Sequence, residues 1–140
     1  MLDLADGDSM AFITDKASKT TISVKADTLE NLLSDDNLDN LTLAKIDIEG
    51  AEILALQGAS KLLQKQISQV WIMEINNKIN NFQHEKNEVV ELLEFYGYQL
   101  YKYNANENKL DLIDLEQHQG NNVLVIAENA VEFVEKRLKN

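Results

Sequence analysis

Cysteine and proline are both missing from this 140-residue sequence. Without cysteine, the chain can form neither a disulfide framework nor a thiolate metal site, and it has no thiol nucleophile. Without proline, its turns must rely on Gly, Asn and Asp. Glycine is also scarce, and no two of its five positions are close enough to form a loop that cradles a phosphate or a cofactor. These positions are Gly7, Gly50, Gly58, Gly97 and Gly120.

Basic residues are few, with 13 Lys and Arg against 24 Asp and Glu, and the net charge is −11. This charge repels phosphates, so we expect neither nucleic acid nor an anionic membrane surface as a partner. No apolar run approaches the length of a membrane span, and the N-terminus lacks the basic and apolar regions of a signal peptide. We therefore expect a cytoplasmic protein with one domain over residues 1–140.

The most informative stretch runs from Leu43 to Glu52, where a short apolar segment ends in three carboxylates and a glycine. An apolar run directly before a helical pattern is typical of a buried strand that feeds a helix in an open parallel sheet. Such sheets bind ligands beyond the carboxyl ends of their strands. Asp47 and Glu49 would lie at that end, and Gly50 allows a sharp turn.

The acidic residues of this stretch also have a structural explanation. Acids in the first turn of a helix interact well with its dipole and satisfy free N–H groups, and we favour this role for Glu52. A carboxylate such as Asp47 is costly at the end of an apolar strand unless it lies in a cleft or is paired, which favours a functional role. Because grouped carboxylates repel one another, we expect at least one of Asp47, Glu49 and Glu74 to titrate above its usual pKa.

The rest of the sequence alternates between strand and helix patterns. Short strands are predicted over residues 2–5, 10–14 and 21–26 as an antiparallel flap, followed by a short helix over 29–33 and an acidic loop over 34–40. Helices are predicted over 51–66 and 85–96 and from 129 onward. Central strands are predicted over 43–47, 70–75 and 123–127, with further strands over 98–103 and 110–115.

Other candidate site residues follow the strand over 70–75. Glu74 and Asn76 fall at its carboxyl end, although Asn76 and Asn77 also fit simple turn chemistry. His84 comes next and is the better candidate for a general base, whereas His118 fits an ordinary surface position. The acidic loop over 34–40 lacks the ligand spacing of a calcium loop, and we predict no metal site.

The run Lys45-Ile46-Asp47-Ile48-Glu49-Gly50-Ala51-Glu52, with Leu56 and Gly58-Ala59 after it, resembles the K-I-D-V-E-G-A-E…L-x-G-A signature of FkbM-type methyltransferases. Further similarity lies in residues 24–33, 70–74 and 92–101. The resemblance implies an α/β fold with a Rossmann-like class I methyltransferase sheet. It also implies S-adenosylmethionine as cofactor and methyl transfer to a hydroxyl of a sugar or other small molecule. By this resemblance, Asp47, Glu49 and Glu74 are candidate catalytic residues, together with His84 from its position, and Asp47 and Gly50 are candidate cofactor-binding residues.

One departure from the family pattern concerns the cofactor. Such enzymes open with a strand and a glycine-rich turn of the D-x-G-x-x-x-G kind, and this sequence has none. We therefore interpret it as the C-terminal part of an N-terminally truncated methyltransferase. The strand over 43–46 should then expose an apolar edge that invites self-association or a partner strand, unless the N-terminal strands cover it. Cofactor binding should be weak.

Two further interpretations remain open. The chain can be a non-catalytic remnant or an interaction module that needs a partner carrying the cofactor-binding half. Alternatively, its acidic loop can bind a carbohydrate or a cation.

Overall fold

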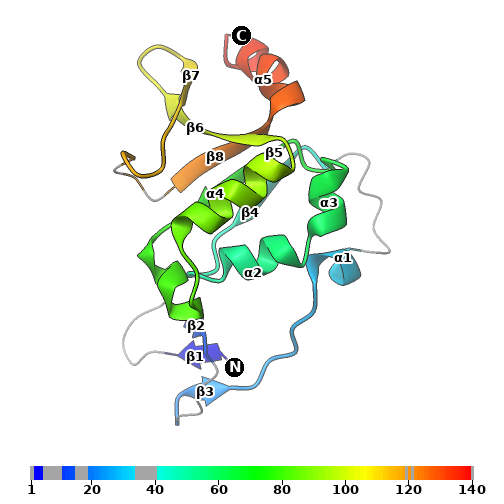
Figure 1. Ribbon diagram of the computed structural model, residues 1–140, viewed down its shortest axis with the longest axis vertical. Coiled ribbons are helices and arrows are strands. Elements are labelled where there is room, and N and C mark those ends of the chain that lie inside the picture. Colours follow the sequence, from blue (N-terminus) through cyan, green and yellow to red (C-terminus); the bar gives the residue numbers. More distant parts are fainter. Residues whose placement is uncertain are drawn as a thin grey trace.

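A computed structural model of the chain describes residues 2–4, 11–14, 19–33, 41–118, 120 and 122–139. At the N-terminus, β1 (Leu2–Leu4), β2 (Ala11–Ile13) and β3 (Thr21–Ile22) form an antiparallel sheet in the order β2-β1-β3. Figure 1 shows this small sheet at one end of the molecule, joined to the larger part by an extended segment. The antiparallel flap is therefore confirmed, although its third strand is shorter than predicted.

The larger sheet has five strands in the order β4-β5-β8-β6-β7. They are β4 (Leu43–Ile46), β5 (Val70–Glu74), β6 (Tyr98–Asn104), β7 (Lys109–Leu112) and β8 (Asn122–Ala127). Only β4 and β5 run parallel, so the fold is mixed α/β with a mostly antiparallel sheet. The predicted central position is confirmed for β5 and β8 and is wrong for β4, which lies at an edge. The N-terminal strands pair among themselves and do not cover that edge.

The single helix predicted over residues 51–66 is wrong, because it is divided into α2 (Glu52–Gln57) and α3 (Ser60–Gln64). The break is where the short helix α1 (Leu29–Leu32) docks. A Cβ atom on Gly58 would lie 3.3 Å from Cβ of Thr28, so the two segments approach closely. The Glu30 carboxylate accepts hydrogen bonds from the Lys61 N–H at 2.6 Å and the Ser60 hydroxyl at 3.1 Å. It thereby satisfies the Lys61 N–H in the first turn of α3, which starts that helix anew.

The remaining helices follow the sheet strands. A 3₁₀ helix, η2 (Asn77–Phe82), comes after β5, and α4 (Lys86–Phe95) leads into β6. Gly97 has φ +76° just after α4, as expected of a C-terminal cap. The chain ends with η3 (Glu128–Ala130) and α5 (Val131–Leu138). Among the described residues, no helix combines the length and apolar composition needed to cross a membrane.

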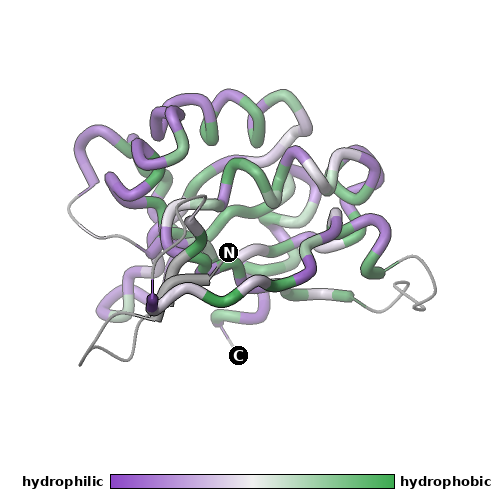
Figure 2. The backbone as a smooth tube through the Cα atoms, turned by 90° about the horizontal axis from the view of Figure 1, so that it is seen from below, coloured by the Kyte–Doolittle hydropathy of each residue, from purple (hydrophilic) through white to green (hydrophobic). Residues whose placement is uncertain are grey.

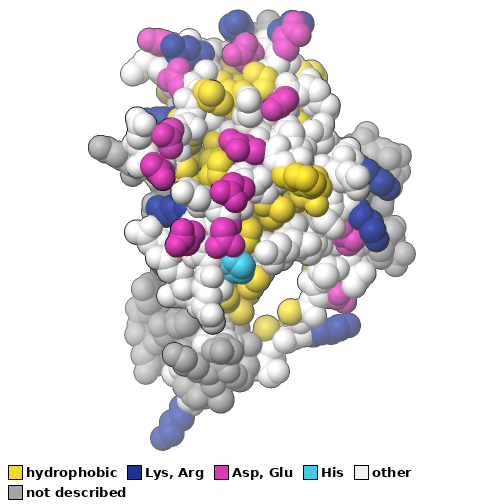
Figure 3. Space-filling view, in the orientation of Figure 1, with side chains coloured by type: hydrophobic (Ala, Val, Ile, Leu, Met, Phe, Trp, Pro, Cys, Tyr) yellow, Lys and Arg dark blue, Asp and Glu magenta, His cyan; other side chains and the backbone are white. Residues whose placement is uncertain are grey.

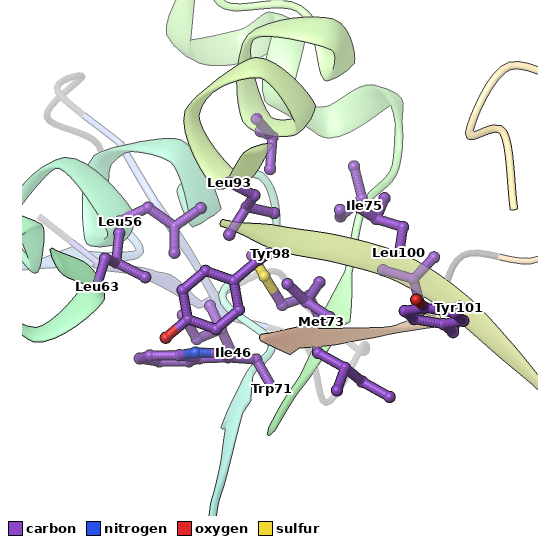
Figure 4. Packing of buried hydrophobic residues seen from close by; sticks show 14 of the residues in the cluster. Ile46, Leu56, Leu63, Trp71, Met73, Ile75, Leu93, Tyr98, Leu100 and Tyr101 are labelled. Atoms are coloured by element: carbon purple, nitrogen blue, oxygen red, sulfur yellow. The ribbon is translucent and has the colours of Figure 1, made fainter. Parts of the chain in front are cut away.

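The core lies between the sheet and the helices α2, α3 and α4, which lie in front of it in Figure 1. Side chains alternate along β5, so that Trp71 and Met73 are buried. Figure 4 shows Leu56, Leu63 and Leu93 from the three helices gathered around Tyr98. Figure 2 shows the hydrophobic segments concentrated in the middle of the molecule. This packing fixes the ends of β4 and β5 relative to each other.

Candidate functional site

Polar side chains meet where β4 and β5 end. The two strands run parallel with Ile46 opposite Met73, so their carboxyl ends lie side by side. Asp47 follows β4, and Glu74 ends β5. Glu74 accepts a hydrogen bond of 3.0 Å from the Asn76 amide. The structure thus brings Asp47, Glu74 and Asn76 together at the carboxyl ends of β4 and β5, where the sequence analysis placed them.

Asp47 forms an ion pair with Lys45, whose Nζ lies 2.8 Å from Oδ2. This hydrogen bond is the main reason why the pKa of Asp47 lies below its usual value, and Glu74 and Lys78 lower it further. In turn, Asp47 raises the pKa of Lys45. For Asp47, the paired cation therefore outweighs repulsion from neighbouring carboxylates. A neighbouring cation decides its charge, and Asp47 is ionised at neutral pH.

The turn after Asp47 has an unusual backbone. Glu49 has φ +58° and Gly50 has φ +104°, both in the region that favours glycine. A Cβ atom on Gly50 would lie 2.5 Å from the carbonyl oxygen of Lys78, so this position has no room for a side chain. The Lys78 ammonium also forms an ion pair with the Glu49 carboxylate. Glu49 and Gly50 are thus clamped against η2, and the Glu49 carboxylate is already engaged.

Glu52 holds this turn from the inside. Its Oε1 accepts hydrogen bonds of 3.2 Å from the N–H groups of both Ile48 and Gly50. The residue is only 1% exposed, and Oε2 is buried without a hydrogen-bond partner among the described residues. This geometry agrees with the structural explanation for Glu52. It also means that the N–H groups at 48 and 50 are taken and do not face a ligand.

Lys78 and η2 were not anticipated from the sequence. Asn76 begins η2 by accepting a hydrogen bond of 2.8 Å from the Lys78 N–H, which is the turn chemistry considered as its alternative role. The signal for the helix start was therefore present in Asn76. The contact between Lys78 and Glu49 joins residues 29 positions apart and has no local signature.

His84 contacts a carboxylate of α4. Its Nδ1 lies 2.8 Å from the Glu88 carboxylate. Glu88 also accepts a hydrogen bond of 2.9 Å from the Glu85 N–H, as part of the capping box that begins α4. His84 is therefore tied to the start of α4 rather than to a signature carboxylate.

No group of three or more metal-ligating side chains occurs among the described residues, and the acidic loop over 34–40 lies outside them. One hollow, of about 500 Å³, lies away from the strand ends, between residues 26–29 and α2. The strand-end carboxylates Asp47 and Glu74 do not line this hollow.

A family model described as the Methyltransferase FkbM domain matches residues 2–100. The match includes the strands β1 to β5, the turn over residues 48–50 (the signature turn) and α4. It ends within β6. No curated protein and no solved structure matches the chain.

Proposed function

This chain belongs to the FkbM methyltransferase family, and we propose that it serves the transfer of a methyl group from S-adenosylmethionine to a hydroxyl of a sugar or other small molecule. The observation that carries this proposal is the pair of carboxylates, Asp47 and Glu74, at the adjacent ends of β4 and β5. In open α/β sheets, ligands bind beyond the carboxyl ends of parallel strands. An ionised carboxylate suits the cationic sulfonium and ammonium groups of this cofactor.

The described residues fit one end of the cofactor only. Asp47 and Glu74 would hold its cationic part, whereas its carboxylate needs N–H donors. Glu52 already occupies the N–H groups of Ile48 and Gly50, and no glycine-rich turn supplies others. When bound, the cofactor supplies an activated methyl group. We therefore expect weak binding by this chain alone, with further donors coming from elsewhere.

The chain's own contribution to the reaction would be mostly orientation. Asp47 has a lowered pKa and is a weak base, so it would hold the cofactor or the acceptor hydroxyl rather than remove a proton. Glu49 is paired with Lys78, so it would serve the shape of the turn. His84 stays our candidate base, because an imidazole accepts a proton more readily than a carboxylate.

A second candidate function is an interaction module that needs a partner with the cofactor-binding half. The observation in its favour is the edge of β4, where no other described strand pairs on the side away from β5. Leu43 on this edge is 52% exposed. An apolar edge of this kind accepts an additional strand, either from such a partner or from a second copy of the chain.

Calorimetric titration with S-adenosylmethionine and with S-adenosylhomocysteine, which lacks the sulfonium charge, tests the first proposal. We expect weak binding that favours the charged cofactor. Asp47→Asn should lower this preference about fivefold, since one partly exposed charge contact contributes about 1 kcal/mol. The control is Asp111→Asn, an acid at the far edge of the sheet, which should change neither affinity.

The two candidate functions give different results in this experiment. Tight binding by a monomer would contradict the need for a partner. Absence of binding, also after a candidate partner is added, would contradict the methyltransferase proposal and favour the non-catalytic module.

A further inference from the structure

The outer face of α4 carries three exposed glutamates, Glu88, Glu91 and Glu94, at every third residue. With a rise of about 1.5 Å per residue, the row extends about 9 Å along the helix. Like charges at this spacing destabilise a helix, and Glu94 lies in the last turn, at the negative end of the helix dipole. That turn contains no basic residue. Helix formation therefore explains Glu88, which belongs to the capping box of α4, but it does not explain Glu91 and Glu94.

Charge neutralisation within the chain does not explain Glu91 and Glu94 either. Glu88 interacts with His84. For Glu91 and Glu94, no ion pair occurs among the parts of the chain that the structure describes. Two carboxylates of α4 thus stand exposed beside each other, in a protein with a net charge of −11.

Two hollows border the row. One of about 330 Å³ lies between α2 and α4, with Ile53 and Leu92 in its lining and Glu88 and Glu91 at its side. Phe95 also lines it and is 80% exposed. On the other side, Glu94 borders a hollow of about 400 Å³ between α4, β6 and residues 112–116. Figure 3 shows acidic side chains gathered on this face, next to exposed hydrophobic surface.

We propose that this surface, the α4 face (Glu88, Glu91, Leu92, Glu94 and Phe95), docks a basic segment of a partner protein. Lys or Arg side chains of the segment meet the glutamates, and a bulky apolar side chain covers Phe95. Opposite charges across an interface steer association and fix its register. A buried aromatic anchor is a usual source of affinity.

The two features together select this class of partner. Nucleic acid carries the same charge as the glutamate row and is repelled. A polyamine or metal ion meets the carboxylates and leaves Phe95 in water. A basic amphipathic segment satisfies both, because residues three or four apart lie on one face of a helix and match the glutamate spacing. This proposal does not depend on methyltransferase activity.

The test uses a short amphipathic helical peptide of Lys and Leu as probe, with calorimetry for affinity and amide NMR shifts for location. The Lys and Leu peptide should bind, with the largest shifts in residues 86–97. A peptide in which Ser replaces Leu, and spermidine, should each bind at least about tenfold more weakly, because they leave Phe95 exposed. Equal binding of spermidine would overturn the proposal in favour of a plain cation site.

Two variants separate this surface from the overall charge. Glu91→Gln with Glu94→Gln should weaken peptide binding about tenfold, and so should Phe95→Ala. The matched control, Glu132→Gln with Glu135→Gln on α5, removes the same charge and should leave the affinity unchanged. These side chains lie outside the buried core, so the NMR spectrum can confirm that each variant is folded. An equal loss in the control, or shifts centred away from α4, would overturn the proposal.

Discussion

The two edges of the five-stranded sheet are built differently. At β7, Lys109 forms ion pairs with Glu107 and Asp111, and Asn104 donates a hydrogen bond of 3.0 Å to Asp111. Charged side chains of this kind protect an edge strand from pairing with other chains. At β4, the sequence is Leu-Ala-Lys-Ile, and Leu43 is 52% exposed. The β7 edge therefore carries more charge than the β4 edge, where Lys45 is the one charged residue of the strand.

The loops that adjoin these edges differ as well. Beside β7, a four-residue turn joins two paired strands, with Asn108 at φ +51° accepting a hydrogen bond from Tyr103. Beside β4, the signature turn depends on η2 and on the buried Glu52. The turn next to β7 is therefore held mainly by its own hairpin, with one further hydrogen bond from the Asn108 amide to the Leu138 carbonyl, whereas the turn next to β4 is also clamped by Lys78 of η2. Substitutions in the two regions should reveal this difference.

Gly50→Ala should have the largest effect, because it adds a side chain at φ +104° and within 2.5 Å of the Lys78 carbonyl oxygen. We expect the free energy of unfolding to fall by about 3 kcal/mol, measured by thermal or denaturant unfolding. Gly58→Ala is the matched control, since Gly58 has φ −78° and its nearest neighbour would be 3.3 Å away. That change should cost less than about 1 kcal/mol. Equal losses at both glycines would contradict the clamp at Lys78.

Glu52→Ala should have the next largest effect. It leaves the buried N–H group of Gly50 and the part-buried N–H group of Ile48 without an acceptor, which costs about 2 kcal/mol. Glu52→Gln keeps an oxygen in the place of Oε1 and should cost clearly less. Hydrogen exchange at these two amides, together with chemical unfolding, provides the measurement. Unchanged exchange in the alanine variant would show that Glu52 does not hold the turn.

The smallest effect concerns two acids, one beside each edge. The pKa of Asp47 is lowered mainly by Lys45, and that of Asp111 mainly by the Asn104 amide. Because folding favours the ionised form, each acid stabilises the fold above its unfolded pKa, near 3.8, and this contribution is lost as pH falls through the lower folded value. NMR titration of the carboxyl carbons should place both midpoints below 3.8. A raised midpoint at Asp47 would mean that carboxylate repulsion outweighs Lys45.

Local patterns predicted a large part of the fold. The apolar runs of β5 and β8, the helical periodicity of α4 and its cap at Gly97 are all present. The division of the helix between α2 and α3 was not predicted, because it depends on Glu30, about 30 residues away. The edge position of β4 contradicts its prediction as a central strand, but it agrees with the expectation that this strand lacks a neighbour and exposes an edge.

The candidate site shows the same division. The grouping of Asp47 with Glu74 followed from two parallel strands that end together. The Lys45 partner was within reach of sequence reasoning, because residues two apart on a strand point to the same face. Lys78 was not, because its position depends on how η2 folds back onto the signature turn.

Light scattering during size-exclusion chromatography, over a range of protein concentrations, tests most directly whether the β4 edge accepts another strand. We predict that the chain associates as concentration rises and that Leu43→Lys, which places a charge on this edge, weakens association. Leu112→Lys is the matched control on β7, where the leucine is 65% exposed, and it should have no effect. A wild-type chain that stays monomeric throughout, or equal effects of the two substitutions, would contradict the distinction between the two edges.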